Sequence, residues 1–203
     1  MSDEMKAVHK DYGSAKLGMW IFLFSEIVLF GGLFLLYSAY RAKYTADFHN
    51  GGQELNLAIA IINTVVLLTS SLTIAVSTTA LQKGNRKLSL RCLALTIFFG
   101  LMFLVDKYIE WSREIGHGMY PNSPKLLSRP DGVKIFYGLY FSMTGLHGIH
   151  ILAGIILLSI IFSFIRRNKI TANDFTKLEN AGLYWHLVDV IWIFLLPLFY
   201  IAA

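Results

Sequence analysis

The sequence is poor in charged residues and has almost no cysteine. Only 15% of its 203 residues are charged, whereas 55% are hydrophobic, and the mean hydropathy is +0.55. This balance is too apolar for an ordinary soluble domain, and it predicts a membrane protein. The single cysteine, Cys92, lies inside an apolar run. An internal disulfide, a Cys-x-x-Cys pair and a Cys-x-x-Cys-His haem-attachment motif are therefore excluded.

The sequence also lacks a continuous basic face. There are 18 Lys and Arg residues against 13 Asp and Glu, a net charge of +5, but the basic residues fall in short breaks between apolar runs. We therefore expect no nucleic-acid partner. The first apolar run is longer than the core of a cleaved signal peptide and has no small-residue cleavage motif after it, which predicts a retained membrane span.

Five apolar stretches are long enough to cross a bilayer, because a helix needs about 20 apolar residues to cross a hydrocarbon core about 30 Å thick. They are residues 17–40, 55–82, 88–112, 134–165 and 180–202. Turn-forming residues separate them, among them the run at 49–52 and the loop from Pro121 to Pro130. The sequence therefore predicts an all-α, polytopic membrane protein, a bundle of five transmembrane helices that forms one domain over residues 1–203.

The basic residues are unequally divided between the two sides of this bundle. The side of the N-terminus holds 11 of them: Lys6, Lys10, Lys16, Lys83, Arg86, Lys87, Arg91, Arg166, Arg167, Lys169 and Lys177. The opposite side holds six: Arg41, Lys43, Arg113, Lys125, Arg129 and Lys134. Since cytoplasmic loops carry the excess of Lys and Arg, we expect a cytoplasmic N-terminus and a C-terminus outside.

Glu26 is the most unusual residue of the first span. It lies about 14 Å from the start of that span, at a rise of about 1.5 Å per residue, and so close to the membrane midplane. An ionised carboxylate at that depth costs several kcal/mol unless it is protonated, partnered or hydrated, and a functional, proton-related role is the default interpretation. The alternative is a neutral Glu26 that bonds a neighbouring helix, such as the face of the second span with Asn63, Ser70 and Ser71.

Three histidines lie deep inside predicted spans. His147 and His150 are spaced i, i+3 on one face of the fourth span, and His186 and Asp189 have the same spacing in the fifth. A protein with two b-type haems needs four axial ligands, so three deep histidines are too few. One haem or one copper stays open as an alternative. The interpretation we favour is that these side chains form hydrogen bonds between helices or subunits.

Two further polar groups belong to the second and third spans. Asn63 begins a track of small polar residues in the second span, which favours helix packing. Asp106 and Glu110 share a face near the end of the third span, where Lys107 or Arg113 can neutralise Glu110 at three-residue spacing. That cluster is either an ordinary ion pair or part of a site.

Taken together, these residues resemble the cytochrome c oxidase subunit III family over essentially the whole five-span region. The segments that carry the resemblance are 20–30 with Ser25-Glu26, 63–71, 100–111, Thr144-Gly145-x-His147-Gly148-x-His150, and Trp185-His186-x-Val188-Asp189-x-x-Trp192. Larger members of the family have seven transmembrane helices, whereas this chain resembles the short bacterial form that begins at the third.

The resemblance implies a non-catalytic subunit of a haem-copper terminal oxidase in the bacterial inner membrane. Such a subunit packs beside subunit I, in a complex with subunit II and other small subunits. It binds phospholipid but no redox cofactor, since the haems and copper that reduce oxygen to water belong to its partners. It stabilises subunit I, supports proton uptake and protects the enzyme during turnover. The carbodiimide-reactive carboxylate of the family maps onto Glu26, and the buried histidines map onto His147, His150 and His186.

Other functions remain open at this level. The subunit III of a quinol oxidase and the accessory subunit of nitric oxide reductase share the five-span plan, and partner subunits decide the electron donor. A membrane haem protein is a second alternative. A secondary transporter with Glu26 and Asp189 as proton relays is a third, although we find none of the inverted repeats or broken helices that such transporters show.

Overall fold

The computed structural model describes residues 2–172 and 174–201, with side chains from residue 13 onward. The side chains of Lys6 and Lys10, which contribute to the predicted charge asymmetry, lie outside the described residues, as does Ala202 of the last predicted span. Within the described ranges the protein folds into α-helices and contains no β-strand. The all-α prediction is confirmed.

The helices are α1 (Ser2–Lys43), α2 (Thr45–Gln53), α3 (Leu57–Gln82), α4 (Arg86–Gly116), α5 (Pro124–Leu127), α6 (Asp131–Arg166) and α7 (Thr176–Leu196), and a π-helical segment (Pro197–Ile201) follows α7. In this part of the chain, five helical stretches are long and apolar enough to cross a membrane: Gly13–Lys43, α3, α4, α6 and Thr176–Ile201. The five-helix prediction is confirmed. Most of these helices run a few residues past the apolar stretches, because polar residues at their ends continue the helix.

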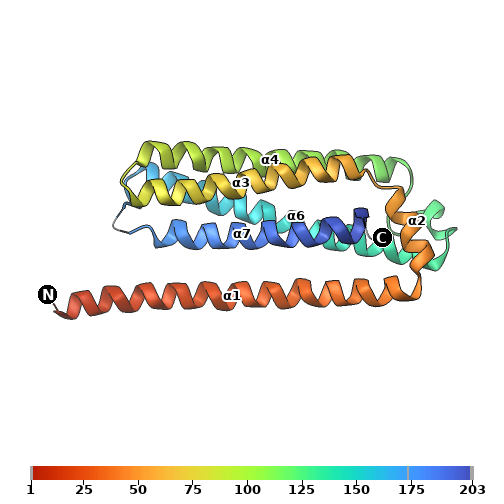
Figure 1. Ribbon diagram of the computed structural model, residues 1–203, viewed down its shortest axis with the longest axis horizontal. Coiled ribbons are helices and arrows are strands. Elements are labelled where there is room, and N and C mark those ends of the chain that lie inside the picture. The colour runs from red at the N-terminus through yellow and green to blue at the C-terminus, as the bar shows by residue number, and fades with distance from the viewer. Residues whose placement is uncertain (1, 173, 202–203) are drawn as a thin grey trace.

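The bundle has a tight group of four helices and one flanking helix. Figure 1 shows α3, α4, α6 and α7 together, with α1 lying along one side, where it contacts α6 and α7. Leu23, Phe30 and Tyr37 of α1 are buried, whereas most of its other apolar side chains are exposed. Residues seven apart return to nearly the same side of a helix, so α1 is attached along one narrow stripe.

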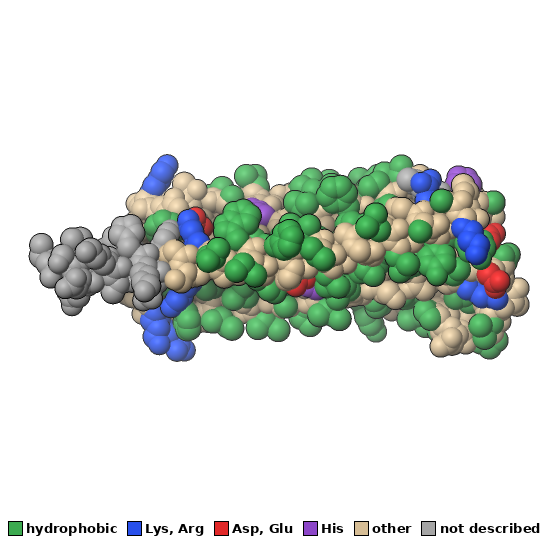
Figure 2. All heavy atoms as spheres, turned by 90° about the horizontal axis from the view of Figure 1, so that it is seen from below, with side chains coloured by type: hydrophobic (Ala, Val, Ile, Leu, Met, Phe, Trp, Pro, Cys, Tyr) green, Lys and Arg blue, Asp and Glu red, His purple; other side chains and the backbone are tan. Residues whose placement is uncertain are grey.

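The outer surface of the bundle is apolar over its length and charged at its ends. Figure 2 shows hydrophobic side chains over the middle of the visible face and Lys and Arg side chains towards its two ends. Large apolar side chains such as Phe24, Leu72 and Ile149 are more than half exposed. A soluble monomer rarely exposes apolar patches of this extent. The protein is a multi-pass membrane protein.

Local sequence signals explain several helix ends. Asn56 and Asn85 cap α3 and α4, since their side-chain oxygens accept hydrogen bonds from the backbone N–H groups of Ile59 (3.2 Å) and Leu88 (3.1 Å). Gly84 lies between these two helices with a φ of 76°, a left-handed conformation that favours glycine.

The turn predicted at residues 49–52 is wrong. These residues lie within α2, and Gly51 and Gly52 are buried. A Cβ added at Gly51 would lie 2.5 Å from Cδ1 of Phe136 in α6. The glycine therefore allows α2 to approach α6 closely. A glycine that is required for helix packing looks in the sequence like a glycine that forms a turn, which is why the prediction failed.

Trp185 joins four helices at the centre of the bundle. Its indole N–H donates a hydrogen bond of 2.9 Å to Oγ of Ser70 in α3. A Cβ added at Gly100 of α4 would lie 2.7 Å from the Trp185 ring, and one added at Gly154 of α6 would lie 2.8 Å from it. The two glycines leave the space that this fully buried side chain of α7 fills.

Candidate functional site

Glu26 of α1 is paired with His150 of α6. Oε2 of Glu26 lies 2.9 Å from Nε2 of His150, and the two side chains are 13% and 14% exposed. The ring of Phe30 lies edge-on to the imidazole, with 5.4 Å between the ring centroids. The hydroxyl of Tyr184 in α7 donates a 3.0 Å hydrogen bond to the backbone carbonyl of His150. Three helices therefore fix the position of this pair.

The hydrogen bonds of His150 restrict where its protons can be. Nδ1 lies 2.8 Å from the carbonyl oxygen of Leu146. A carbonyl oxygen only accepts, so Nδ1 carries a hydrogen. Nε2 then either accepts a hydrogen bond from a protonated Glu26 or, when protonated, donates one to its carboxylate. The pair is electrically neutral in both arrangements, which lowers the cost of placing it inside a membrane.

The partner of Glu26 differs from the alternative considered from the sequence, which placed a neutral Glu26 against the Asn63, Ser70 and Ser71 face of the second span. That alternative is wrong about the helix, because His150 of α6 is the partner. The structure therefore joins two residues predicted as separate candidates, 124 positions apart in the chain, in one hydrogen-bonded pair.

A second cluster surrounds Lys107 and Glu110 of α4. Nζ of Lys107 lies 2.9 Å from Oε2 of Glu110, and both residues are buried. Nζ also donates a 2.6 Å hydrogen bond to the hydroxyl of Tyr200. The hydroxyls of Tyr140 (2.5 Å) and Tyr200 both donate to Oε1 of Glu110. The predicted neutralisation of Glu110 by Lys107 is confirmed, and both carboxylate oxygens have partners.

Aromatic rings enclose the charged end of Lys107. Its Nζ lies 4.5 Å from the ring centroid of Trp192 and 5.2 Å from that of Tyr200. His147 stacks on Trp192, with 5.4 Å between the ring centroids, and meets the ring of Phe103 edge-on at 5.4 Å. Cation–π attraction adds to the ion pair in stabilising this buried cation.

A third polar group lies where α3 meets α7. Nδ1 of His186 lies 2.6 Å from Oγ of Ser71. The indole N–H of Trp192 donates a 3.0 Å hydrogen bond to Oγ1 of Thr64. Together with the bond from Trp185 to Ser70, these contacts attach the middle of α7 to α3, as the interpretation of polar groups between helices expects.

Three predicted residues make no such contact. His147, Asn63 and Asp189 are buried, and their polar side-chain atoms have no hydrogen-bond partner among the described residues. His147 is enclosed by the rings of Phe103 and Trp192, which accounts for the difference from His150 three residues later. The shared helix face predicted for the two imidazoles therefore does not give them a shared environment. Among the residues that the structure describes, no three His, Cys, Asp or Glu side chains come close enough together to hold one metal ion.

Two tyrosines that complete the Lys107 cluster were not predicted from the sequence. Tyr140 lies seven residues before His147, on nearly the same side of α6. This helical spacing is a sequence signal that could have indicated Tyr140 as a neighbour of the buried polar residues. Tyr200 lies in the π-helical segment after Pro197, and its approach to Glu110 across 90 residues has no local signal.

Comparison with known proteins agrees with this architecture. The family model described as cytochrome c oxidase subunit III matches residues 3–203. Cytochrome c oxidase subunit 3 of Thermostichus vulcanus is 33% identical over 188 residues, which is 92% of this chain and 87% of that protein. Cytochrome bo(3) ubiquinol oxidase subunit 3 of Pseudomonas aeruginosa is 26% identical over 96% of this chain and 88% of its own length.

A longer relative shows the same similarity over part of its length. Cytochrome c oxidase subunit 3 of Allomyces macrogynus is 32% identical over 88% of this chain but only 63% of its own length. The family match runs across all five spans, including the segments that contain Glu26, Glu110, His150 and His186. The chain belongs to the cytochrome c oxidase subunit III family.

Proposed function

We propose that this protein is an accessory subunit of a haem-copper terminal oxidase, without an active site of its own. It packs against subunit I in a complex with subunit II and other small subunits. The haems and copper that reduce oxygen to water belong to those partners. The match of nearly the entire chain to the subunit III family carries this proposal.

The contacts inside the bundle support an accessory role. His150 and His186, two of the three deep histidines, bond Glu26 and Ser71 of other helices. The ammonium of Lys107 is held by Glu110 and Tyr200. These side chains form hydrogen bonds between helices, as polar side chains commonly do in membrane bundles.

Glu26 and His150 are the pair with a proposed proton-related role. They hold an exchangeable proton at a neutral site, on the side of the bundle where α1 meets α6. Within the oxidase the pair would sustain proton uptake and protect the enzyme during turnover, and the bundle would bind phospholipid at its apolar surface. The proposed location is the bacterial inner membrane, with the N-terminus in the cytoplasm.

Copurification tests this function. The chain is tagged, extracted in mild detergent from the membranes of its native host, and its partners are identified by mass spectrometry together with the visible spectrum of the preparation. We expect subunits I and II in equal amounts with this chain, and haem absorption from the complex. A chain that is isolated without any oxidase subunit would contradict the proposal.

A quinol oxidase is the second candidate, because the sequence similarity to a bo(3) ubiquinol oxidase subunit 3 extends over almost the whole chain. The donor is decided by measuring oxygen consumption of the purified complex with reduced cytochrome c and with ubiquinol. Activity with ubiquinol alone, in a complex whose subunit II lacks copper, would favour this second candidate.

A further inference from the structure

Four buried aromatic side chains form a continuous row through one half of the bundle. The ring centroids of Trp192 and Tyr200 are 6.5 Å apart, and those of Tyr200 and Tyr140 are 6.4 Å apart. The centroids of Tyr140 and Tyr137 are also 6.4 Å apart. Separations of about 4.5–7 Å are typical of aromatic rings in contact. Tyr200 is 7% exposed and the other three are fully buried. These four residues, the aromatic row, are close enough for an electron to pass directly between neighbouring rings.

Each tyrosine of the aromatic row donates its hydroxyl to a carboxylate. Tyr140 (2.5 Å) and Tyr200 donate to Oε1 of Glu110. Tyr137 donates to Oε2 of Glu54 at 2.9 Å. A phenol that loses an electron becomes a strong acid, and a carboxylate within hydrogen-bond reach can take its proton at once. These hydrogen bonds therefore favour reversible one-electron oxidation of the three tyrosines.

Other buried tyrosines of the bundle lack such a base. Tyr37 donates to the backbone carbonyl of Leu198, and Tyr184 donates to that of His150 at 3.0 Å. A backbone carbonyl accepts a hydrogen bond but does not take up a proton. Among the described residues, tyrosine hydroxyls therefore meet carboxylates only in the aromatic row, where the rings also follow one another in space.

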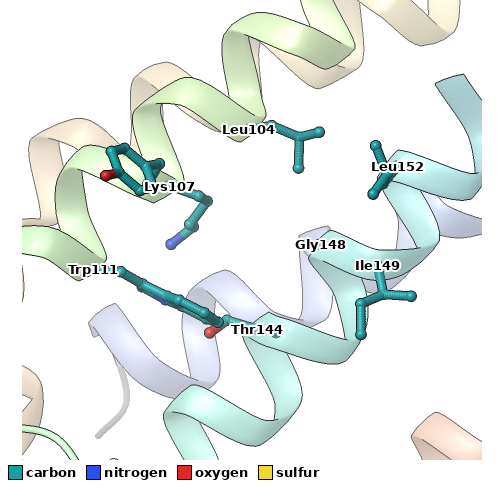
Figure 3. Close-up of a pocket in the computed structure, with 9 residues that line it drawn as sticks. Leu104, Lys107, Trp111, Thr144, Gly148, Ile149 and Leu152 are labelled. Carbon is teal, nitrogen blue, oxygen red and sulfur yellow. The ribbon is translucent and has the colours of Figure 1, made fainter.

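The charge of Lys107 gives the aromatic row a direction. Its Nζ lies 4.5 Å from the ring centroid of Trp192, 5.2 Å from that of Tyr200 and 5.7 Å from that of Tyr140. Figure 3 shows Lys107 reaching from α4 towards α6 at the groove between these helices. A nearby positive charge makes it harder to remove an electron from a ring, and this effect decreases with distance. An oxidised site at Trp192 therefore moves along the row, away from Lys107, to Tyr137.

The aromatic row ends beside an exposed ion pair. The side chain of Glu54 is 38% exposed, and its Oε1 lies 3.4 Å from Nη2 of Arg129, whose side chain is 43% exposed. A proton that Glu54 receives from Tyr137 can therefore leave to water. Trp192 lies at the other end, and its N–H donates to the hydroxyl of Thr64, which is no base for that proton.

We propose that the aromatic row carries oxidising equivalents from Trp192 to the protein surface at Glu54. The oxidant is a strong one-electron oxidant of the kind that incomplete reduction of oxygen produces in a neighbouring redox subunit, so this proposal rests on the proposed function. It removes one electron from Trp192. Trp192 then takes an electron from Tyr200, and Glu110 receives the phenolic proton of Tyr200.

The later steps repeat this exchange. Tyr140 reduces Tyr200, and Glu110 returns one phenolic proton and receives the other. Tyr137 reduces Tyr140, which recovers its proton from Glu110, while Glu54 receives the proton of Tyr137. A water-soluble reductant of the ascorbate class then reduces Tyr137, which recovers its proton from Glu54. The four side chains end unchanged, and one electron has passed from the reductant to the oxidant.

A light-driven oxidant placed beside Trp192 tests the aromatic row. Ile193 follows Trp192 in α7 and is 42% exposed, so Ile193→Cys in a Cys92→Ser background can carry a rhenium tricarbonyl photo-oxidant. The full chain is labelled in detergent and excited with an external electron acceptor present, and radicals are followed by time-resolved absorption. We expect a tryptophan radical and then tyrosyl radicals. The tyrosyl signal that Tyr137→Phe removes is the signal of Tyr137.

Glu54→Gln tests the role of the carboxylate. The amide oxygen of Gln still accepts the hydrogen bond of Tyr137 but cannot take up its proton. We expect the oxidation of Tyr137 to slow about 100-fold, as on loss of a general base. Tyr184→Phe is the matched control, because the hydroxyl that it removes bonds a backbone carbonyl, and it should leave every rate unchanged.

Ascorbate tests the exit from the aromatic row. Added to the solution, it should shorten the lifetime of the tyrosyl radicals in the labelled parent protein. In the Tyr137→Phe variant the row stops at Tyr140, which is fully buried, so the same ascorbate concentration should shorten the lifetime several-fold less.

Two results would overturn the proposal. The first is the absence of a Tyr137 radical in the labelled parent protein, and the second is an equal rate of Tyr137 oxidation in the parent and in the Glu54→Gln variant. Both measurements use a light-driven oxidant in the purified chain, so neither depends on whether oxidase subunits copurify with it. The proposed function and this proposal therefore fail separately.

Discussion

Glu26 and Glu110 lie inside the spans, and each is paired with a base from the same chain. The two pairs differ in surroundings. Glu26 and His150 are joined by one hydrogen bond at the edge of the bundle, whereas Glu110 accepts from Lys107, Tyr140 and Tyr200 in its interior. A proton can move within the first pair without creating net charge. In the second pair both carboxylate oxygens of Glu110 already accept hydrogen bonds, as expected of a cluster with a structural role.

Glu26→Gln removes the exchangeable proton of the Glu26 side chain but keeps a hydrogen bond to His150. The amide of Gln donates to Nε2 of His150, so the packing is retained and we expect a loss of stability below about 1 kcal/mol. The exchangeable proton is lost, so proton uptake by the oxidase in vesicles should slow, or the enzyme should inactivate after fewer turnovers. Wild-type behaviour in both assays, with the complex assembled, would remove the proton-related role of Glu26.

Lys107→Met tests the interior pair. Removing one member of a buried ion pair leaves an uncompensated charge, and we expect destabilisation of about 3 kcal/mol. The double variant Lys107→Met with Glu110→Gln removes both charges and should be less destabilised than the sum of the single variants. Thermal unfolding of the four purified proteins measures this coupling. Additive effects of the two changes would show that the pair does not act as a unit.

At the scale of helices, Trp185 and its two glycines hold the four-helix group together. Gly154→Ala places a methyl group 2.8 Å from the Trp185 ring, and we expect destabilisation of about 2 kcal/mol from overpacking. Gly138→Ala on the same helix meets nothing within 4 Å and should leave stability unchanged or slightly raised. Equal melting temperatures for the two variants would contradict the role assigned to Trp185.

The sequence predicts the number of membrane-spanning helices well, because a run of about 20 apolar residues is rare outside membrane spans. It fails at α2, where Gly51 serves close packing against Phe136 and its pattern is typical of a turn. The Lys107–Glu110 pair is local and follows from helical spacing. The partner of Glu26 is not local, since a sequence alone does not show which of the other helices α1 packs against.

At the scale of the whole molecule, the charge distribution predicts one orientation. The first residues of α1 and the last of α7 lie at opposite ends of the bundle, as an odd number of crossings requires (Figure 1). The excess of Lys and Arg at the N-terminal end favours the cytoplasm for that end.

Cysteine labelling measures this orientation. With the native Cys92 changed to Ser, Lys87→Cys places a thiol in the first turn of α4, and Ser128→Cys places one after α5, both at exposed positions. A membrane-impermeant thiol reagent added to intact spheroplasts should label Cys at 128 and leave Cys at 87 unlabelled until the membrane is opened. The reverse pattern would contradict the predicted orientation.

The central proposal is that this chain assists redox chemistry that takes place in its partners. Metal and haem analysis of the polypeptide, separated from every other subunit but still folded in detergent, is its sharpest test. We expect iron and copper far below one atom per chain, with both metals recovered in the fraction that holds subunits I and II. Stoichiometric iron or copper in the isolated polypeptide would contradict the assignment of an accessory role.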